Sequence, residues 1–387
     1  MDYGGRELAI TLTITIVVWA TFIGIYAYNL FSSGPTFDMA WYFLEENPEG
    51  GTLAYPLGAM AYFAFIRSFA GTPESFTVAF HALSLAWLGL LFFIYGKMMR
   101  IERLLMVSII FAILIYFVID RVEIVAVALA FSGAYLFSEG KRMGGWLAAI
   151  AGAFVKVFPV FLLPLFAIPE WGKKGGAKRV GIAGAVCVLL LLASPATINS
   201  LMYQSQRGLQ VESVYSSVLL AANQFLDMGI RTQESWGSVH LVLPEGLQWL
   251  VPASTLLQAA AVGAVILAYA LDKRRGSRFW EYCFLVLAVG VLFGKIGSTQ
   301  FMLWPVAFAV PLIGKGDMRL YAMCIALAVF AILVFPYGWY SLYMMETLPI
   351  AVLAARNLVL AGMVAHVGLR LNEKGMEKAE HVARPDL

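Results

Sequence analysis

The run LAITLTITIVVWATFIGIYAYNLF, residues 8–31, decides the fold class of this chain. It contains no charged residue, and as a helix it is longer than the ~20 residues that cross the hydrocarbon core of a bilayer. The run has neither a basic start nor a small-residue cleavage site. We therefore expect a retained membrane span and not a removed signal.

The rest of the chain has the composition of a membrane protein. Of its 387 residues, 61% are hydrophobic and only 13% are charged, whereas soluble domains carry roughly 25% charged residues. We therefore predict a single all-α, polytopic transmembrane domain over residues 1–387. It should contain about 11–13 spans, at 8–31, 55–70, 75–96, 104–119, 122–138, 144–168, 179–198, 249–271, 280–296, 299–314, 319–337 and 348–369.

Prolines and cysteines inside the apolar runs refine this expectation. Pro159 and Pro164 interrupt the run 144–168, which favours two short helices in a hairpin. The cysteines all fall inside apolar runs, so no disulfide framework is expected for Cys187, Cys283 and Cys324. The chain also lacks the internal sequence repeat that is common in transporters.

The positions of Lys and Arg predict the orientation in the membrane, because basic loops lie in the cytoplasm. This rule places the tail 370–387 in the cytoplasm together with four clusters, 141–142, 173–179, 273–278 and 315–319. The loops predicted outside are 32–54, 199–248, 295–300 and 338–347.

One basic cluster conflicts with this topology. Simple alternation of spans from residue 55 onward puts Lys97, Arg100 and Arg103 outside. Either the region 55–96 contains a segment that does not cross the membrane, or this cluster breaks the rule.

The first predicted external loop is acidic and aromatic. Its stretch FDMAWYFLEENPEGGTLAYPLG, residues 37–58, contains Asp38, Glu45, Glu46 and Glu49 but no Lys or Arg. The segment MAWYFLEE predicts a short helix in the plane of the membrane interface. Asp38 is either a functional acid or a cap of that helix, whereas the three glutamates are expected to be solvated.

Ionisable residues within or beside apolar spans are costly and usually functional. Six residues of this kind stand out: Asp120, Arg121, Glu123, Lys156, Lys295 and Arg356. Some of them also have a structural interpretation. Lys156 can snorkel to an interface, Arg121 can pair with Glu123 at a helix start, and Arg356 can tie helices together with Asn357.

Two further residues have structural interpretations of the same kind. His81 lies in an apolar run and is expected to be a packing histidine. Arg207 can pair with Glu212. His240 lies in a predicted polar loop, where the sequence gives it no role.

The sequence holds no motif for a metal or a nucleotide. It has no His pair at i, i+4, no Cys pair, no Asp-x-Asp, no P-loop and no dinucleotide glycine pattern. The energy for any chemistry is therefore expected to arrive with the substrate, and no nucleic-acid partner is expected.

Four stretches of the chain carry a family resemblance. They are FD (37–38) with YPLG (55–58), DRVEIVAVALAFSGAYLFSEGKRMGGWLAAIAGAFVKVFPVFLLPL (120–165), QRGLQVES (206–213) and GKIGSTQFMLWPV (294–306). In this order they resemble the GT-C membrane glycosyltransferases, and most closely glycosyltransferase family 87. That family includes polyprenyl-phosphate-mannose-dependent mannosyltransferases. The resemblance covers about residues 8–370.

The resemblance implies a polyprenyl-phosphate sugar as donor and a glycolipid or glycan hydroxyl as acceptor. It implies transfer with inversion on the extracytoplasmic side of the cell membrane. Mannose is the sugar that the family favours, while arabinose, glucose or another pentose stay open. In GT-C enzymes the first external loop carries the catalytic acid, which implies Asp38. Many of these enzymes have two adjacent acids there, so with a single aspartate an essential divalent metal stays open but is not favoured, and no other cofactor is expected.

Elementary chemistry gives these residues separate roles. Glycosyl transfer has an oxocarbenium-like transition state, and Asp38 can take the proton of the attacking hydroxyl. Negative charge develops on the leaving phosphate, for which Lys156, Arg207 and Lys295 are the candidate cations. Asp120 and Glu123 are three residues apart and are expected to share one helical face. The full set of candidate substrate-binding residues is Tyr55, Asp120, Arg121, Glu123, Lys156, Arg207, Gln210, Glu212, Lys295 and Gln300.

Other functions stay open on sequence grounds. A polytopic transporter or flippase for lipid-linked sugars predicts a water-filled path with an ion-coupled carboxylate at mid-membrane. A transferase predicts charges gathered in one outer-face cavity with a side opening for lipid. Most charges outside the loops fall near span ends, which favours the transferase. A protein that only binds glycolipid is the third interpretation.

Overall fold

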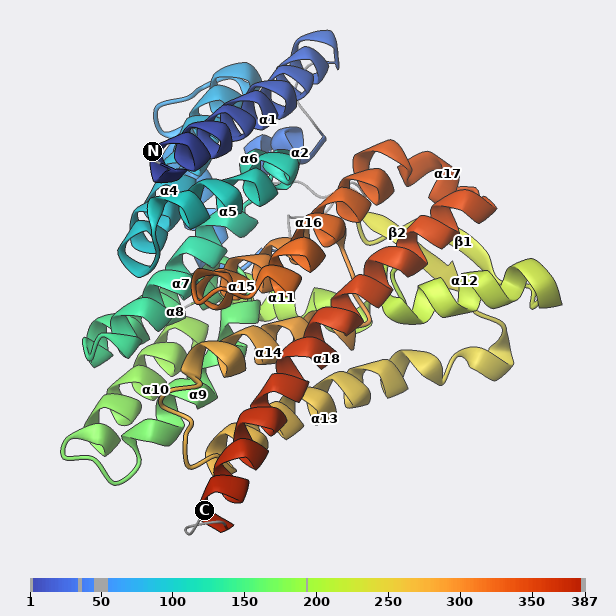
Figure 1. Cartoon of the computed structure of the whole chain (residues 1–387). Coiled ribbons are helices and arrows are strands. Elements are labelled where there is room, and N and C mark those ends of the chain that lie inside the picture. Colours follow the sequence, from blue (N-terminus) through green and yellow to red (C-terminus); the bar gives the residue numbers. More distant parts are fainter. Residues whose placement is uncertain (1–2, 34–36, 45–54, 193, 384–387) are drawn as a thin grey trace.

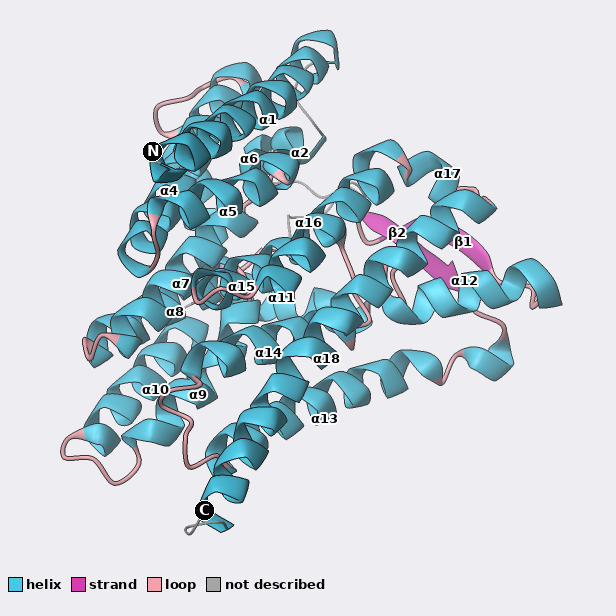
Figure 2. Cartoon of the chain, viewed as in Figure 1, coloured by secondary structure: helices cyan, strands magenta, loops and turns pink. Residues whose placement is uncertain are grey.

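The computed structural model describes residues 3–33, 37–44, 55–192 and 194–383. Within these ranges the chain is almost entirely helical, with one short β-hairpin (Figure 2). Five described segments are long and apolar enough to cross a membrane, and a sixth results if a pair bent by 81° counts as one span. The predicted class, an all-α membrane protein, is confirmed.

The helices cross the body of the molecule in alternating directions (Figure 1). The first half of the chain contains α1 (Tyr3–Ser33), α2 (Phe37–Leu44), α3 (Leu57–Arg67), α4 (Pro73–Met98), α5 (Ile101–Ile113), α6 (Ile115–Ile119), α7 (Glu123–Ser138), α8 (Arg142–Val155), η1 (Phe158–Leu162), α9 (Leu163–Ala167), η2 (Ile168–Glu170), α10 (Gly176–Leu192) and α11 (Pro195–Gln206). The second half contains α12 (Val214–Leu226), β1 (Arg231–Ser235), β2 (Ser238–Val242), η3 (Glu245–Leu247), α13 (Leu250–Leu271), α14 (Phe279–Leu292), η4 (Thr299–Met302), α15 (Leu303–Gly314), α16 (Met318–Ile332), η5 (Leu333–Tyr337), α17 (Trp339–Tyr343) and α18 (Thr347–Ala383).

The candidate spans are a subset of these elements. They are Leu8–Tyr28 in α1, Pro73–Met98, Glu245–Leu271, Met318–Tyr337 and Thr347–Leu371. Other predicted spans correspond to shorter apolar helices of 10–17 residues, such as α7, α8, α14 and α15. The count of 11–13 spans therefore stays a prediction.

The predicted break in the run 144–168 is confirmed. Helix α8 ends at Val155, and Lys156 has extended backbone angles. The chain then returns as the short helical pieces η1, α9 and η2, because Pro159 and Pro164 each lack the N–H that a continuous helix needs. The returning segment packs back on α7, where the rings of Phe137 and Phe166 stack with centroids 4.3 Å apart.

Helices α7 and α8 pack closely because glycines lie at their crossing. A Cβ atom built on Gly145 would lie 2.8 Å from the carbonyl oxygen of Gly133. Small residues at such crossings let helix backbones approach within a membrane. This packing fixes Glu123, at the start of α7, near Lys156, at the end of α8.

The basic cluster 97–103 has a simple structural explanation. Helix α3 has only 11 residues, which gives it a length of about 16 Å and makes it too short to cross a membrane alone. Arg67 at its end donates to the carbonyl oxygen of Phe43 in α2. At the far end of α4, Arg103 donates to the carbonyl oxygen of Gly314, beside the basic residue Lys315. These contacts favour the first of the two interpretations, a segment within 55–96 that does not cross, and the orientation of the cluster stays a prediction.

The ends of two helices, α2 and α18, differ from the prediction. The short helix predicted in the first external loop is α2, which begins two residues earlier than the segment MAWYFLEE. Helix α18 continues to Ala383, so the segment from Arg370 extends the last helix and is not a separate tail. Glu45, Glu46 and Glu49 lie outside the described residues.

Candidate active site

Four of the predicted site residues lie where helices begin or end. Asp38 is in the first turn of α2, Asp120 caps the C-terminus of α6, and Glu123 is the first residue of α7. Lys156 is the C-cap of α8. A carboxylate in a first helical turn is stabilised by the helix dipole, which suits both Asp38 and Glu123.

Asp38 forms an ion pair with Arg121. The side chains are 13% and 12% exposed, and Arg121 Nη1 donates to Asp38 Oδ1. Burial raises the pKa of the Asp38 carboxyl above its usual range, although the Arg121 guanidinium opposes the shift. The guanidinium also lies 5.5 Å from the ring centroid of Phe335. The expected alternative, a pair between Arg121 and Glu123, is wrong.

Glu123 pairs instead with Lys156. The carboxylate is fully buried, and its Oε1 lies 2.7 Å from Lys156 Nζ and accepts from Gln300 Nε2 at 2.8 Å. Lys156 also lies 4.5 Å from the ring centroid of Tyr55. Tyr55 in turn contacts Tyr42 through their hydroxyl groups, 3.1 Å apart. Lys156 therefore does not snorkel to an interface, because it is held inside by a buried carboxylate.

Asp120 belongs to a separate hydrogen-bonded group. Its Oδ1 accepts from the Tyr26 hydroxyl at 2.5 Å and lies 2.8 Å from His81 Nε2. Its other oxygen, Oδ2, is buried without a hydrogen-bond partner among the described residues. Asp120 and Glu123 do not share one helical face, because α6 ends before Asp120 and α7 begins at Glu123.

Sequence reasoning gave His81 only as a satisfied packing histidine and did not single out Tyr26. Both lie on apolar helices, α1 and α4, where packing is the ordinary role of such side chains. The only available signal was that His81 is a titratable group in a predicted span.

Arg207 and Lys295 form a basic cluster with His240. Lys295 Nζ donates to the carbonyl oxygens of Arg207 at 2.6 Å and Ser205 at 2.8 Å. Arg207 Nε lies 3.3 Å from His240 Nε2 and donates to it. Within the described part of the chain, no carboxylate lies within 4 Å of either cation. The expected pair between Arg207 and Glu212 is therefore absent there.

The pKa values in this cluster reflect burial and mutual repulsion. Burial and the neighbouring Arg207 lower the pKa of His240 to about 3, so its ring is neutral and accepts the hydrogen bond. Burial also lowers the pKa of Arg207, and burial together with Arg207 lowers that of Lys295. A bound anion would form charge-assisted hydrogen bonds with these cations and offset their repulsion.

Glu212 and Gln210 form a hydrogen-bonded group next to this cluster. Glu212 Oε1 accepts from the backbone N–H of Thr299 at 2.9 Å and from its hydroxyl, and Glu212 Oε2 accepts from Gln210 Nε2 at 2.9 Å. Arg356 donates to the carbonyl oxygens of Glu212 and Gly297. Arg356 also bonds Asn357, as the structural interpretation predicted. These contacts hold the backbone of both segments in place.

The segment 294–300 connects the two groups of charges. Its Lys295 bonds the carbonyl of Arg207, its Thr299 bonds Glu212, and its Gln300 bonds Glu123. The candidate residues therefore come from six separated parts of the chain.

The chain matches no protein-family model, no curated protein and no solved structure. The described residues also contain no group of three or more His, Cys, Asp or Glu side chains placed to hold a metal ion.

The site therefore has two chemical capacities. Asp38 is a buried carboxyl with a raised pKa, which is the property of a general base. Arg121 and Lys156 supply positive charge near it, and Arg207 and Lys295 form a second group of cations. Fixed charges in a largely dry site stabilise developing negative charge far better than water does.

Proposed function

We propose that this protein is a GT-C type membrane glycosyltransferase, similar to family 87. It transfers a sugar, mannose by the family resemblance, from a polyprenyl-phosphate donor to a hydroxyl of a glycolipid or glycan. Transfer proceeds with inversion on the extracytoplasmic side of the membrane. The observation that supports the proposal is the buried pair of Asp38 with Arg121, next to the pair of Glu123 with Lys156, which the segment 294–300 links to Arg207 and Lys295.

Asp38 is the proposed base. The acceptor hydroxyl loses its proton as it attacks the anomeric carbon, and a carboxylate whose pKa is raised by burial is suited to take it. Arg121 orients this carboxylate through their ion pair. Asp120 and Glu123 are proposed to contact the sugar, because each keeps one buried oxygen without a partner among the described residues.

Arg207 and Lys295 are the proposed ligands of the donor phosphate. Lys156 and Arg121 are each neutralised by a carboxylate, whereas the described surroundings of Arg207 and Lys295 offer none. A phosphate supplies the missing negative charge, and the guanidinium can bind it with two N–H groups. This arrangement stabilises the phosphate as it leaves the sugar.

A small apolar cleft lies beside this site. It lies between α1, α5, α6 and the end of α16, and it has a volume of about 30 Å³. Tyr26 lines the cleft and bonds Asp120, so the cleft adjoins the charged groups. Its other lining residues are Phe22, Ile25, Ile113, Ile115, Tyr116, Ile332, Pro336 and Tyr337.

The rival function, transport of lipid-linked sugars, receives less support. An ion-coupled transporter needs a titratable carboxylate along a path between the two sides. Three described carboxylates of the site, Asp38, Glu123 and Glu212, are instead paired with Arg121, Lys156 and Arg356. The fourth, Asp120, is bonded by Tyr26 and His81.

The test is sugar transfer by purified protein. Labelled polyprenyl-phosphate mannose is incubated with the protein in proteoliposomes that contain native lipid extract, and labelled product is measured. Asp38→Asn should bind donor and fold normally but lose roughly 10²-fold or more of turnover. Wild-type turnover should also fall as the pH drops through the raised pKa of Asp38, because the protonated acid is no base.

Asp227→Asn is the matched control. Asp227 is exposed and has a left-handed backbone conformation, which asparagine also adopts readily. It should keep wild-type turnover. Turnover of Asp38→Asn within threefold of wild type would remove Asp38 from the chemistry. Transfer of the intact lipid-linked sugar across the vesicle, without new glycosidic product, would favour the transporter.

A further inference from the structure

The connection between η2 and α10 presents an exposed tryptophan beside lysines. Trp171 is 92% exposed, and Lys173, Lys174 and Lys178, which follow it in the sequence, are exposed as well. We call these four side chains the Trp–Lys surface. Tryptophan is highly buried on average in folded proteins, so an exposure this high calls for a partner that covers the ring.

A buried carboxylate holds this connection in place. Glu170 is fully buried, and its Oε2 accepts from Arg179 Nε at 2.8 Å and also from Arg179 Nη2. Its Oε1 lies 3.7 Å from Arg142 Nε. Arg142 is the first residue of α8, and Arg179 lies in the first turn of α10. The two ion pairs therefore fix the start of α10 against the start of α8.

The backbone of the connection is ordered as well. The N–H of Lys173 donates to the carbonyl oxygen of Glu170 at 3.1 Å, and the N–H of Gly176 donates to that of Lys173 at 2.9 Å. Gly172 and Gly175 have φ angles of +79° and +74°, which suit glycine and few other residues. The side chains of the Trp–Lys surface therefore project from a hydrogen-bonded turn.

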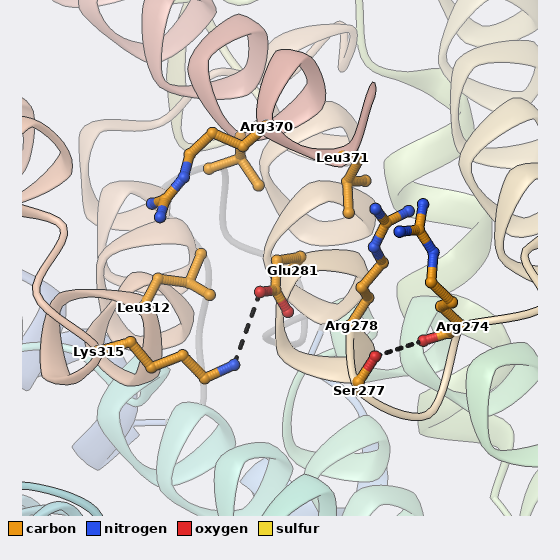
Figure 3. Close-up of a pocket in the computed structure, with 9 residues that line it drawn as sticks. Arg274, Ser277, Arg278, Glu281, Leu312, Lys315, Arg370 and Leu371 are labelled. Atoms are coloured by element: carbon orange, nitrogen blue, oxygen red, sulfur yellow. Dashed lines mark hydrogen bonds and ion pairs between the residues drawn. The ribbon is translucent and has the colours of Figure 1, made fainter. Parts of the chain in front are cut away.

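The lysines of this surface lack the partners that other cations of the chain have. A cavity of about 200 Å³ at the start of α14 provides the comparison (Figure 3). Three cations that line it have carboxylate partners: Arg278 with Asp272, Lys315 with Glu281, and Arg370 with Asp317. By contrast, no carboxylate in the part of the chain that the structure describes lies within 4 Å of Lys173, Lys174 or Lys178.

The Trp–Lys surface continues into an apolar helix. Helix α10 begins at Gly176 and contains no charged residue from Val180 onward. Its exposed side chains include Val188, Leu189 and Leu192. Together with α11, this helix forms the bent pair that counts as a sixth candidate span. We expect acyl chains to cover this face of α10, because it offers them only apolar side chains.

We propose that the Trp–Lys surface binds anionic phospholipid headgroups at the edge of the bilayer. Trp171 inserts its indole at the level of the headgroups, where tryptophan is enriched in membrane proteins. Lys173, Lys174 and Lys178 then contact the lipid phosphates, and each lysine near an anionic surface favours binding about fivefold.

A bilayer fits this surface better than a soluble partner does. An acidic soluble protein matches the charge of the lysines, but it has no reason to adjoin the apolar face of α10. A bilayer with anionic lipids matches both, since it offers negative headgroups beside acyl chains. The proposal does not depend on the proposed function, and it holds for either orientation of the chain in the membrane.

The experiment is photo-crosslinking of the full chain in nanodiscs. Trp171 is replaced with the photoreactive aromatic residue p-benzoylphenylalanine. The nanodiscs contain equal amounts of phosphatidylglycerol and phosphatidylcholine with identical acyl chains, and the lipid adducts are identified by mass spectrometry. Phosphatidylglycerol adducts should exceed phosphatidylcholine adducts about fivefold or more. This excess should shrink in 1 M salt, where the Debye length is only about 3 Å.

Variants separate the charges from the aromatic contact. Lys173→Gln combined with Lys174→Gln should lower the excess of phosphatidylglycerol about fivefold or more and leave lipid adducts in place. Arg231→Gln removes an exposed charge from β1 and should leave the excess unchanged. The matched control carries the photoreactive residue in place of Leu189, on the apolar face of α10. It should form lipid adducts without an excess of phosphatidylglycerol.

Several outcomes would overturn the proposal. Lipid adducts at Leu189 but not at position 171 would place the Trp–Lys surface in water. The absence of adducts at Leu189 would contradict the lipid contact of α10 on which the argument depends. Equal adducts of the two lipids at position 171, or an excess that the double lysine variant retains, would remove the lysine contacts. In intact cells, an adduct with a protein in place of lipid would reassign the surface to a protein partner.

Discussion

Replacing Arg207 with methionine tests whether this residue binds substrate or stabilises the fold. Arg207 is buried, and among the described residues no carboxylate is within 4 Å of it. Methionine keeps most of the apolar volume but removes the charge. We expect folding to survive this change and donor use to suffer.

The stability cost is small because two effects oppose each other. Without Arg207, the buried His240 Nε2 loses its donor, which costs about 1–3 kcal/mol. Relief from burying an unpaired cation contributes a stabilising term of several kcal/mol. Because the two terms have opposite signs, we expect the apparent melting temperature to change by no more than about 5 °C.

The effect on donor use is larger. A hydrogen bond to a charged group contributes about 1.5–3 kcal/mol, which corresponds to roughly a 10- to 150-fold loss of kcat/KM for the donor. The KM for the acceptor should stay within twofold, since Arg207 is assigned to the donor phosphate. The kcat/KM of Arg207→Lys for the donor should lie between those of wild type and Arg207→Met. Lysine keeps the charge but lacks the guanidinium that can bind phosphate with two N–H groups.

The assay is initial-rate transfer from labelled polyprenyl-phosphate mannose, with melting followed in the same detergent. Arg231→Met is the matched control, since Arg231 is exposed on the β-hairpin. Donor kcat/KM for Arg207→Met within threefold of wild type would refute the reasoning. So would a fall in melting temperature large enough to explain the lost activity.

Two further predictions concern the buried pair and the orientation. Lys156→Met should lower the free energy of unfolding by about 3 kcal/mol, because Glu123 is left as a buried charge without its cation. The double variant with Glu123→Gln should recover more than half of this loss. Equal melting temperatures for the single and the double variant would contradict the ion pair. Glu234 is replaced with cysteine in a variant that lacks the three native cysteines. This cysteine should react with an impermeant thiol reagent added to intact cells, because its loop is predicted to lie outside. Labelling only after lysis would reverse the predicted orientation.

Sequence reasoning found most of the charged residues that the structure brings together. Arg121, Glu123 and Lys156 were identifiable because charges beside apolar spans are costly and need a reason, whereas Asp38 was identified through the family resemblance of the first loop. The prolines after Lys156 likewise marked the break that places it at a helix end. These features depend on local chemistry, which a sequence displays directly.

The pairing of these charges was not predictable. Arg121 and Glu123 are close in sequence, yet each pairs with a residue from another segment, Asp38 and Lys156 respectively. Which carboxylate meets which cation is decided by how α2, α7 and α8 pack, and no periodicity in the sequence encodes that. The same limit hid His81 and Tyr26, whose helices are ordinary apolar spans.

The segment 294–300 contacts both the group of charges that contains the proposed base and the group proposed to bind phosphate, so a movement of this segment affects both. Gln300 and Lys295 reach opposite groups of charges, and between them Gly297 lies against Glu212, where an added Cβ would be 2.6 Å from its carbonyl oxygen. No side chain can be inserted there without displacing one group or the other. A local opening of this short segment releases both groups in a single event. We therefore expect the two groups to become ordered together, and variants designed to use another donor to need this segment intact.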